Sequence, residues 1–208
     1  MIFTYNKAHV GDVLMVIVAD SKNQEVAVEK KGQVARVYLE ASGKTVAWNI
    51  FEASEIAEIK GNGQVFLSDE AVAAFNKVLE AEGFTEKLEN DKDPKFVVGQ
   101  IVSMQAHADS DHLNICQVQV GSDKTVQIVA GAPNAAVGLK TIVALPGAMM
   151  PSGSLIFPGQ LRGIESFGMM CAPRELALPN APQKRGIIEL DDQAVVGEAF
   201  DPQKHWKA

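Results

Sequence analysis

The chain of 208 residues is long enough for one large domain or two small ones, with ample length for a buried core. It carries 19 lysine and arginine residues against 26 aspartate and glutamate residues, a formal net charge of −7. This acidic balance argues against bulk electrostatic binding of DNA or of a membrane surface, because such binders usually carry a basic patch.

The start of the chain and its cysteines bear on where the protein works. Residues 1–12 lack the basic start, apolar core and cleavage site of a signal peptide, and no apolar run approaches the length of a transmembrane helix. Cys116 and Cys171 are isolated, and two cysteines are too few for a four-cysteine zinc site. The sequence therefore predicts a soluble cytoplasmic protein with reduced thiols.

Residues 1–60 alternate apolar and polar side chains with a period of two. Their β-branched and aromatic runs are separated by turn residues at Gly11, at 20–23 and at 42–43. This pattern predicts an antiparallel meander of strands. Residues 52–63 then turn out of the sheet and end in a Gly-Asn-Gly breaker.

The clearest helix in the sequence spans residues 68–83. Ser68 is a favourable N-cap and Gly83 a favourable stop. Apolar side chains recur at helical spacing at Val72, Phe75, Val78 and Leu79. One apolar stripe on one helix covers one face of a sheet, so residues 1–85 are predicted to form a small α+β domain. Nothing in that domain indicates a chemical activity.

Residues 86–95 are polar and charged, a composition that suits a linker. The charge is also divided there, because residues 1–90 hold 9 basic and 14 acidic side chains whereas residues 91–208 hold 10 and 12. Residues 95–174 are nearly neutral, with five basic and four acidic side chains. A polyanionic partner is expected to bind that part of the chain.

Residues 96–200 are predicted to form a small barrel, followed by a tail at 201–208. The segments 96–107, 114–121 and 124–131 have strand patterns, and a polar loop follows the first of them. Beyond them, short apolar runs alternate with turns, and seven glycines occur from Gly131 to Gly168, which a helix would not tolerate. Short strands joined by tight turns favour a closed or nearly closed barrel, because closure removes exposed sheet edges.

Four motifs of this second domain resemble a known family. They are HADSDHLNICQVQVG, IVAGAPNAAVGLK, ALPGAMMPSG and LRGIESFGMMCAPREL. In order and spacing they resemble the tRNA-binding domain of bacterial phenylalanyl-tRNA synthetase beta chains and of the endothelial-monocyte-activating-polypeptide type. With a β-rich domain ahead of it, the whole chain is similar to the stand-alone YtpR-type tRNA-binding proteins. The resemblance covers about residues 92–200 and implies an OB-fold barrel, so the fold expected is mainly β.

The sequence departs from that family in two places. The first loop of the family usually has the pattern His-Pro-x-Ala-Asp-Lys-Leu, whereas Ala108 replaces the proline here and His112 replaces the lysine. Pro173 stands where a serine is common. Loss of a lysine from an RNA-facing loop is expected to weaken binding, since phosphate contacts supply much of the affinity for nucleic acids. His112 can still donate a hydrogen bond or stack on a base.

The resemblance implies that the barrel binds tRNA without chemistry and without a cofactor. Few aromatic residues and a nearly neutral surface favour weak, shape-dependent contact with folded tRNA over a single-strand platform. The candidate contact residues are His112, Asn114, Asn134, Lys140, Arg162, Ser166 and Arg174. The alternative for each charged residue is a solvated side chain or a structural ion pair, such as Arg162 with Glu165.

Two other activities are weighed against tRNA binding. His107, Asp109 and Asp111 would share one face of an extended segment and so suggest a metal site, but zinc ligands usually come from separate elements. No serine or cysteine has a catalytic base nearby in sequence, so no enzyme activity and no metal are predicted.

A protein-interaction or dimerisation role is the alternative function. An edge strand at residues 185–190, or the tail with Trp206, would then pair with a second copy to form a homodimer. In that case Arg162 and Arg174 would be paired internally and tRNA would not bind.

Overall fold

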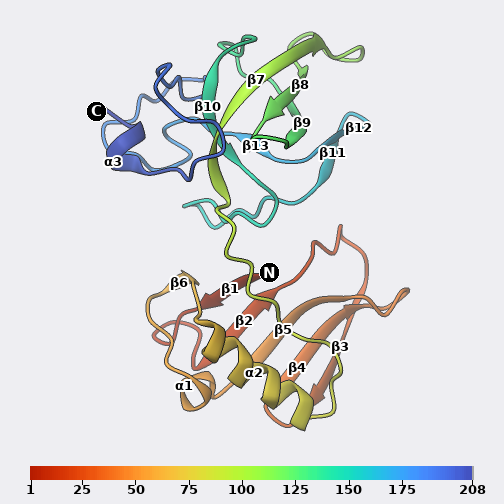
Figure 1. The fold of residues 1–208 in the computed structure, drawn as a ribbon. Coiled ribbons are helices and arrows are strands. Elements are labelled where there is room, and N and C mark those ends of the chain that lie inside the picture. The colour runs from red at the N-terminus through yellow and green to blue at the C-terminus, as the bar shows by residue number, and fades with distance from the viewer. Residues whose placement is uncertain (208) are drawn as a thin grey trace. The chain divides into compact units, whose positions relative to one another are not determined.

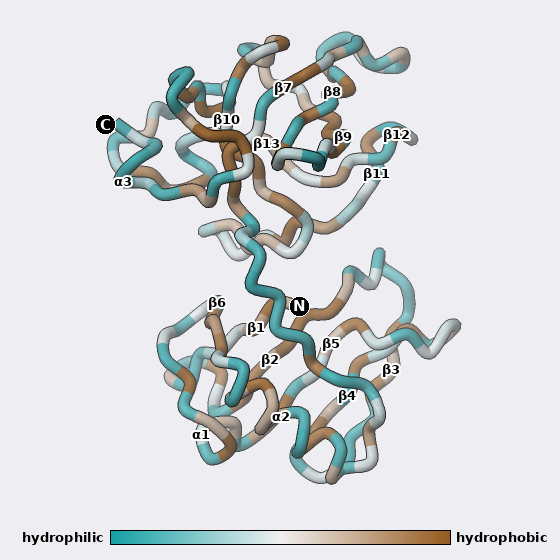
Figure 2. Tube along the Cα trace, in the orientation of Figure 1, coloured by the Kyte–Doolittle hydropathy of each residue, from teal (hydrophilic) through white to brown (hydrophobic). Residues whose placement is uncertain are grey.

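The computed structural model describes residues 1–207, which fall into two compact units that divide between Lys92 and Asp93. The segment that joins them is hydrophilic, whereas the apolar residues are concentrated within each unit (Figure 2). No helix among the described residues is long and apolar enough to cross a bilayer.

The N-terminal unit contains a six-stranded antiparallel sheet (Figure 1). Its strands are β1 (Ile2–Tyr5), β2 (Val13–Ile17), β3 (Val26–Lys31), β4 (Val34–Leu39), β5 (Thr45–Phe51) and β6 (Gly63–Val65). They lie in the order β3-β4-β5-β2-β1-β6.

The antiparallel pairing is confirmed, but the prediction of a simple meander is wrong at one connection. Strand β2 pairs with β5, and the turn at residues 20–23 leads across to β3 at the edge of the sheet. The burial of side chains explains this order. Strand β2 is apolar and at least half-buried along its whole length, whereas β3 ends in Glu29, Lys30 and Lys31, which tolerate solvent. Charged residues on an edge strand also oppose unwanted pairing with other chains.

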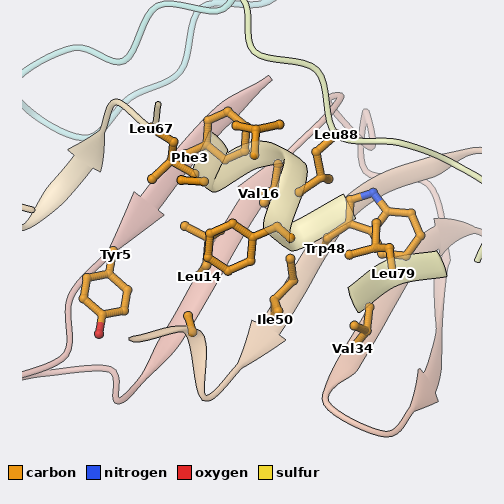
Figure 3. Packing of buried hydrophobic residues seen from close by; sticks show 14 of the residues in the cluster. Phe3, Tyr5, Leu14, Val16, Val34, Trp48, Ile50, Leu67, Leu79 and Leu88 are labelled. Atoms are coloured by element: carbon orange, nitrogen blue, oxygen red, sulfur yellow. The ribbon is translucent and has the colours of Figure 1, made fainter. Parts of the chain in front are cut away.

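The predicted helix is confirmed as α2 (Asp69–Ala81), which covers one face of this sheet. The Ser68 hydroxyl accepts a hydrogen bond from the amide of Ala71 at 3.2 Å, and Gly83 has a φ of +80° just past the helix. Phe75 and Leu79 are fully buried among the apolar side chains of the strands, as the close view of the core shows for Leu79 (Figure 3). A one-turn helix, α1 (Ala53–Ile56), precedes β6.

The chain beyond α2 stays on the N-terminal unit for several residues. Phe84 packs edge-to-face on Trp48, with ring centroids 5.0 Å apart. Leu88 is buried in the same core, and its backbone amide and carbonyl both bond to the side chain of Asn76, at 2.7 and 2.9 Å. Residues 86–95 are mostly polar, but Leu88 among them is buried and attaches this segment to the core of the N-terminal unit.

The C-terminal unit is a nearly closed five-stranded barrel, which confirms the predicted fold class. Its strands are β7 (Phe96–Ala106), β8 (Asn114–Gln119), β9 (Thr125–Ala130), β10 (Lys140–Ala144) and β13 (Met169–Met170), in the order β13-β10-β7-β8-β9. A hairpin of β11 (Gly159–Leu161) and β12 (Ile164–Ser166) lies beside β9. The barrel closes where the amide of Phe167 donates to the carbonyl of Gln127 at 2.8 Å.

Alternate residues of the long strand β7 serve two different cores. Val97 and Ile101 point into the barrel, whereas Val98 packs outside it. Gly99 is needed for the interior, because a Cβ there would lie 2.6 Å from a methyl group of Val143. A register shift after Ile101 then bends the strand around the barrel.

The segment after β13 covers the outer face of β7 and β10. Ile188 is buried there, whereas Ile187 packs in the interior cluster of the barrel. The expected edge strand at 185–190 is reduced to a single bridge between Leu190 and Lys140. The short helix α3 (Pro202–His205) ends at Trp206, whose indole donates to the carbonyl of Pro179 at 2.8 Å. Trp206 is half-buried against the outer core, because this packing removes apolar surface of the ring from water.

Candidate nucleic-acid interface

An open hollow of about 360 Å³ lies on the barrel beside β9 and β13. Its floor is made by β9 and β13, and its walls by the chain that follows each of them and by the end of the loop between β7 and β8. Its lining includes His112, Gly131, Ala132, Met169, Arg174, Arg185 and Gly186.

Two arginines and a histidine lie on this hollow. Arg174 follows β13 and is exposed, and within residues 1–207 its guanidinium has no ion pair and no hydrogen bond. Arg185 donates from Nη2 to the carbonyl of Gly131 at 2.9 Å, which fixes its guanidinium beside the end of β9. Glu175 also lines the hollow, but its carboxylate accepts a hydrogen bond from the amide of Ala172 at 2.7 Å.

His112 belongs to the loop between β7 and β8. The amide of His107 donates to the carbonyl of Leu113 at 2.9 Å, which closes that loop. The imidazole Nδ1 of His112 lies 2.6 Å from a carboxylate oxygen of Asp111, and this bond is the main cause of a lowered pKa at Asp111. The Asp111 carboxylate therefore orients the His112 ring.

Arg162 connects this loop to a second element. It lies in the turn between β11 and β12, with a φ of +46°, and its guanidinium donates to the carbonyl of Asp109. The pair with Glu165 that the sequence suggests is not among the ion pairs of the described residues. The structure thus places Arg162 beside the loop that carries His112.

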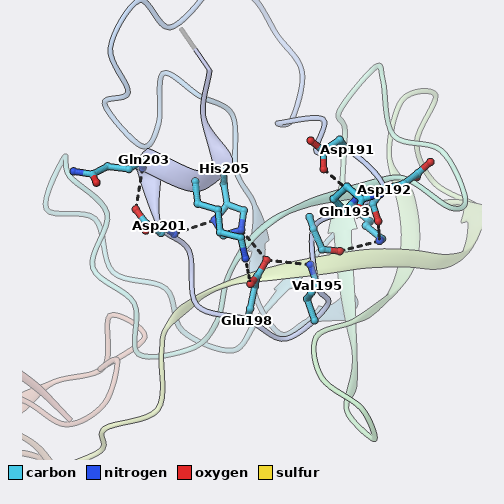
Figure 4. Close-up of polar contacts among 11 residues, drawn as sticks. Asp191, Asp192, Gln193, Val195, Glu198, Asp201, Gln203 and His205 are labelled. Atoms are coloured by element: carbon cyan, nitrogen blue, oxygen red, sulfur yellow. Dashed lines mark hydrogen bonds and ion pairs between the residues drawn. The ribbon is translucent and has the colours of Figure 1, made fainter.

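Three other predicted contact residues are engaged within the chain. Lys140 donates from Nζ to the carbonyls of Asp192 and Ala194, both at 2.8 Å. These two residues belong to the covering segment, and further along it Glu198 accepts hydrogen bonds from the amide of Val195 and bonds to the His205 ring (Figure 4). Lys140 is therefore part of the attachment of this segment to β10.

Asn134 and Ser166 make similar internal bonds. The Asn134 amide exchanges two hydrogen bonds with the backbone of Ile187, at 3.0 and 2.9 Å, and so holds one wall of the hollow. The Ser166 hydroxyl accepts from the amide of Val129 at 3.1 Å and is buried at the closure of the barrel. Asn114 begins β8 and is half-buried, with no side-chain hydrogen bond within residues 1–207.

The structure thus brings His112 and Arg174 to one hollow, with Arg162 next to the His112 loop and Asn134 behind one wall. Lys140 lies apart from them, under the covering segment. Sequence reasoning missed Arg185, which lies 54 residues from its partner Gly131. The only signal was the basic pair Lys184-Arg185 before a glycine.

The residues that suggested a metal site or a nucleophile have other roles. His107 is 3% exposed, and its Nδ1 accepts a hydrogen bond from the amide of Asp109 at 3.0 Å. No three histidine, cysteine or acidic side chains among the described residues are grouped to hold a metal ion. Burial raises the pKa of both thiols, that of Cys171 to about 12, so neither is a good nucleophile at neutral pH.

The two units of the chain match two different protein families. Residues 96–199 match the family described as "Putative tRNA binding domain", and residues 21–91 match "Domain of unknown function (DUF4479)". "Putative tRNA-binding protein YtpR" of Bacillus subtilis is 42% identical over 196 residues, which cover 94% of this chain and 97% of that protein. The chain belongs to the YtpR family. Its predicted family membership is therefore confirmed over nearly its whole length.

Other relatives share the barrel alone. The phenylalanine–tRNA ligase beta subunit of Rhodospirillum rubrum is 50% identical over 103 residues, and that of Aromatoleum aromaticum is 47% identical over 102 residues. Each match covers 49% of this chain and 12% of the ligase subunit. The solved C-terminal domain of Plasmodium vivax p43 matches 53% of this chain and 61% of its own, at 20% identity and a TM-score of 0.38.

Proposed function

We propose that this YtpR-family protein binds folded tRNA on the barrel and catalyses no reaction. The observation that carries the proposal is the Arg174 guanidinium, which has no hydrogen bond or ion pair within residues 1–207 and lies on a hollow that His112 and Arg185 also line. An exposed arginine with no internal partner can bind a phosphate with two parallel hydrogen bonds. Names of relatives support the same partner, since the B. subtilis relative is called a tRNA-binding protein.

In this proposal the predicted contact residues divide into two groups. Arg162, Arg174 and His112 contact phosphates or exposed bases, and Asn114 adds a neutral hydrogen bond. Asn134, Lys140 and Ser166 act indirectly, because their polar atoms already hold one wall of the hollow, the covering segment and the closure of the barrel, respectively. Few cations take part, so binding is expected to be weak and only moderately sensitive to salt.

We also propose that the protein works in the cytoplasm, where tRNA is used. The homodimer stays a prediction. Residues 185–190 and Trp206, which the sequence offers for pairing with a second copy, are packed on their own barrel, so a dimer would have to use other surfaces. Two barrels in one dimer would strengthen binding by multivalency. Light scattering at tens of micromolar protein tests this, and a monomer mass contradicts it.

The function is tested by anisotropy titration of labelled tRNA with the full chain at about 50 mM and about 200 mM salt. The double variant Arg162→Ala/Arg174→Ala should bind more weakly, with a log-log salt slope flatter by at most about two units. Lys124→Ala is the matched control, because Lys124 is exposed on the barrel at the opposite end of β9. It should bind nearly as the unchanged protein does.

Two outcomes would decide against the proposal. Absence of tRNA binding by the unchanged chain at low salt would leave the barrel as a protein-interaction module. An equal loss of binding free energy per removed charge in the double variant and in Lys124→Ala would show that overall charge, rather than this surface, carries the binding.

A further inference from the structure

We propose that the hollow beside β9 and β13 binds one unpaired nucleotide of the RNA, with its base on the apolar floor and its phosphate between Arg174 and Arg185. This inference rests on the proposed function and gives it a definite subsite. The bound group is a single nucleotide turned out of a helix or taken from a single-stranded end.

The size and floor of the hollow fit such a group. At about 360 Å³ it falls within the range of roughly 300–1,000 Å³ that is typical of pockets for small ligands. Ile128, Val129, Ala132 and Met169 supply the apolar lining. Methionine adapts its shape and makes favourable sulfur contacts with aromatic rings, so Met169 suits a base better than a charged group.

The charges on the hollow fit a phosphate. Arginine has five N–H donors, and only one bond is made by Arg185 and none by Arg174 within residues 1–207. Among the described residues that line the hollow, Glu175 is the only acidic one, and its carboxylate accepts a hydrogen bond from the amide of Ala172. A guanidinium plane can in addition stack on a base, which is a common device in the recognition of unpaired RNA.

The walls are held in place before any ligand arrives. A Cβ at Gly131 would lie 3.1 Å from the His112 ring, and a Cβ at Gly186 would lie 3.1 Å from the side-chain oxygen of Asn134. Gly186 also has a φ of +136°, which disfavours other residues. These glycines allow two chain segments to approach the hollow closely. Asn134 and Arg185 then fix the segments by long-range hydrogen bonds, so little ordering is needed on binding.

A duplex does not fit this site as well as an unpaired nucleotide. Paired bases are stacked inside the helix, so a duplex could offer only phosphates to the rim and would leave the apolar floor empty. RNA-binding domains that read bases use bases that are splayed out of the stack. A second hollow of about 500 Å³, which Met150 and Ile156 line, shares Arg174 with the first, so a flanking nucleotide has room beside it.

The test uses the full chain with methyl-labelled methionine and labelled glycine amides, observed by NMR. The probes are a single-stranded tetranucleotide of RNA and a blunt RNA duplex long enough to stay paired at the temperature of the measurement. We expect the tetranucleotide to shift the signals of Met169, Gly131 and Gly186, and the duplex to shift them little. Shifts confined to other residues would refute the subsite, whatever the variants below do.

A filling variant separates the subsite from tRNA binding as a whole. Ala132→Phe puts a ring in the hollow, and Val137→Phe puts the same ring on a residue that is 61% exposed and does not line it. Ala132→Phe should lower the affinity for tRNA by about 5- to 150-fold, the range for one stacked base, and Val137→Phe should leave it unchanged.

The outcomes are distinguishable. If tRNA binds the unchanged chain but Ala132→Phe binds equally well, the subsite is wrong and the proposed function stands. If tRNA does not bind the unchanged chain at all, the proposed function itself has failed. Should Ala132→Phe not fold, the methionine and glycine shifts in the unchanged chain still decide the matter.

Discussion

Replacement of Lys140 by methionine tests whether this residue has a structural role or contacts the RNA. The residue donates two hydrogen bonds from Nζ, one to the part-buried carbonyl of Ala194 and one to the exposed carbonyl of Asp192. A hydrogen bond to a charged group contributes roughly 1.5–3 kcal/mol, and an exposed one less. We therefore expect Lys140→Met to lower the free energy of unfolding of the barrel by about 2–4 kcal/mol, with tRNA affinity unchanged under conditions where the protein is folded.

Urea unfolding followed by tryptophan fluorescence measures this effect. Trp48 lies in the N-terminal core and Trp206 on the barrel, so a Trp48→Phe background reports the barrel alone. With a slope of about 2 kcal/mol per molar urea, the midpoint should fall by roughly 1–2 M. Lys124→Met is the control and should leave the urea midpoint unchanged. An unchanged midpoint together with weaker tRNA binding and a salt slope flatter by about one unit would refute the structural role.

Two further predictions concern stability. The Asp12 carboxylate accepts hydrogen bonds from the hydroxyls of Ser54 and Tyr5, and the bond from Ser54 is the main cause of the lowered pKa of Asp12. Ionised Asp12 therefore stabilises the fold above a pH of about 4, and this stabilisation is lost on acidification. Asp12→Asn should be less stable than the unchanged chain at pH 7 and should show a smaller loss below pH 4 in acid unfolding followed by circular dichroism; equal curves would contradict this. Gly99→Ala should destabilise the barrel by about 1–3 kcal/mol through the clash with Val143, and the added change Val143→Ala should recover part of that loss. Additive losses in the double variant would show that the clash is not the cause.

Features that depend on neighbours in sequence could be predicted from sequence alone. The helix after Ser68 follows from its cap, its apolar spacing and Gly83, all within one segment. The hairpin of β8 and β9 follows from two alternating runs around a four-residue turn. The four motifs of the barrel indicated the family, because each is a local sequence pattern and the four rarely occur together in this order by chance. Among the candidate residues, His112 and Arg174 were found in this way and do line one hollow.

Features that depend on contacts between distant segments were decided only by the tertiary structure. Strand β2 pairs with β5 and not with its neighbour β3, because burial of both its faces outweighs the short connection. Lys140 carries the positive charge expected of an RNA contact, yet its ammonium group donates a hydrogen bond to a carbonyl more than fifty residues away. Trp206 and Arg185 were likewise placed by partners far along the chain. A local pattern fixes backbone conformation and which side chains are apolar, whereas the free energy of burial and of buried hydrogen bonds belongs to pairs that only the complete fold brings together.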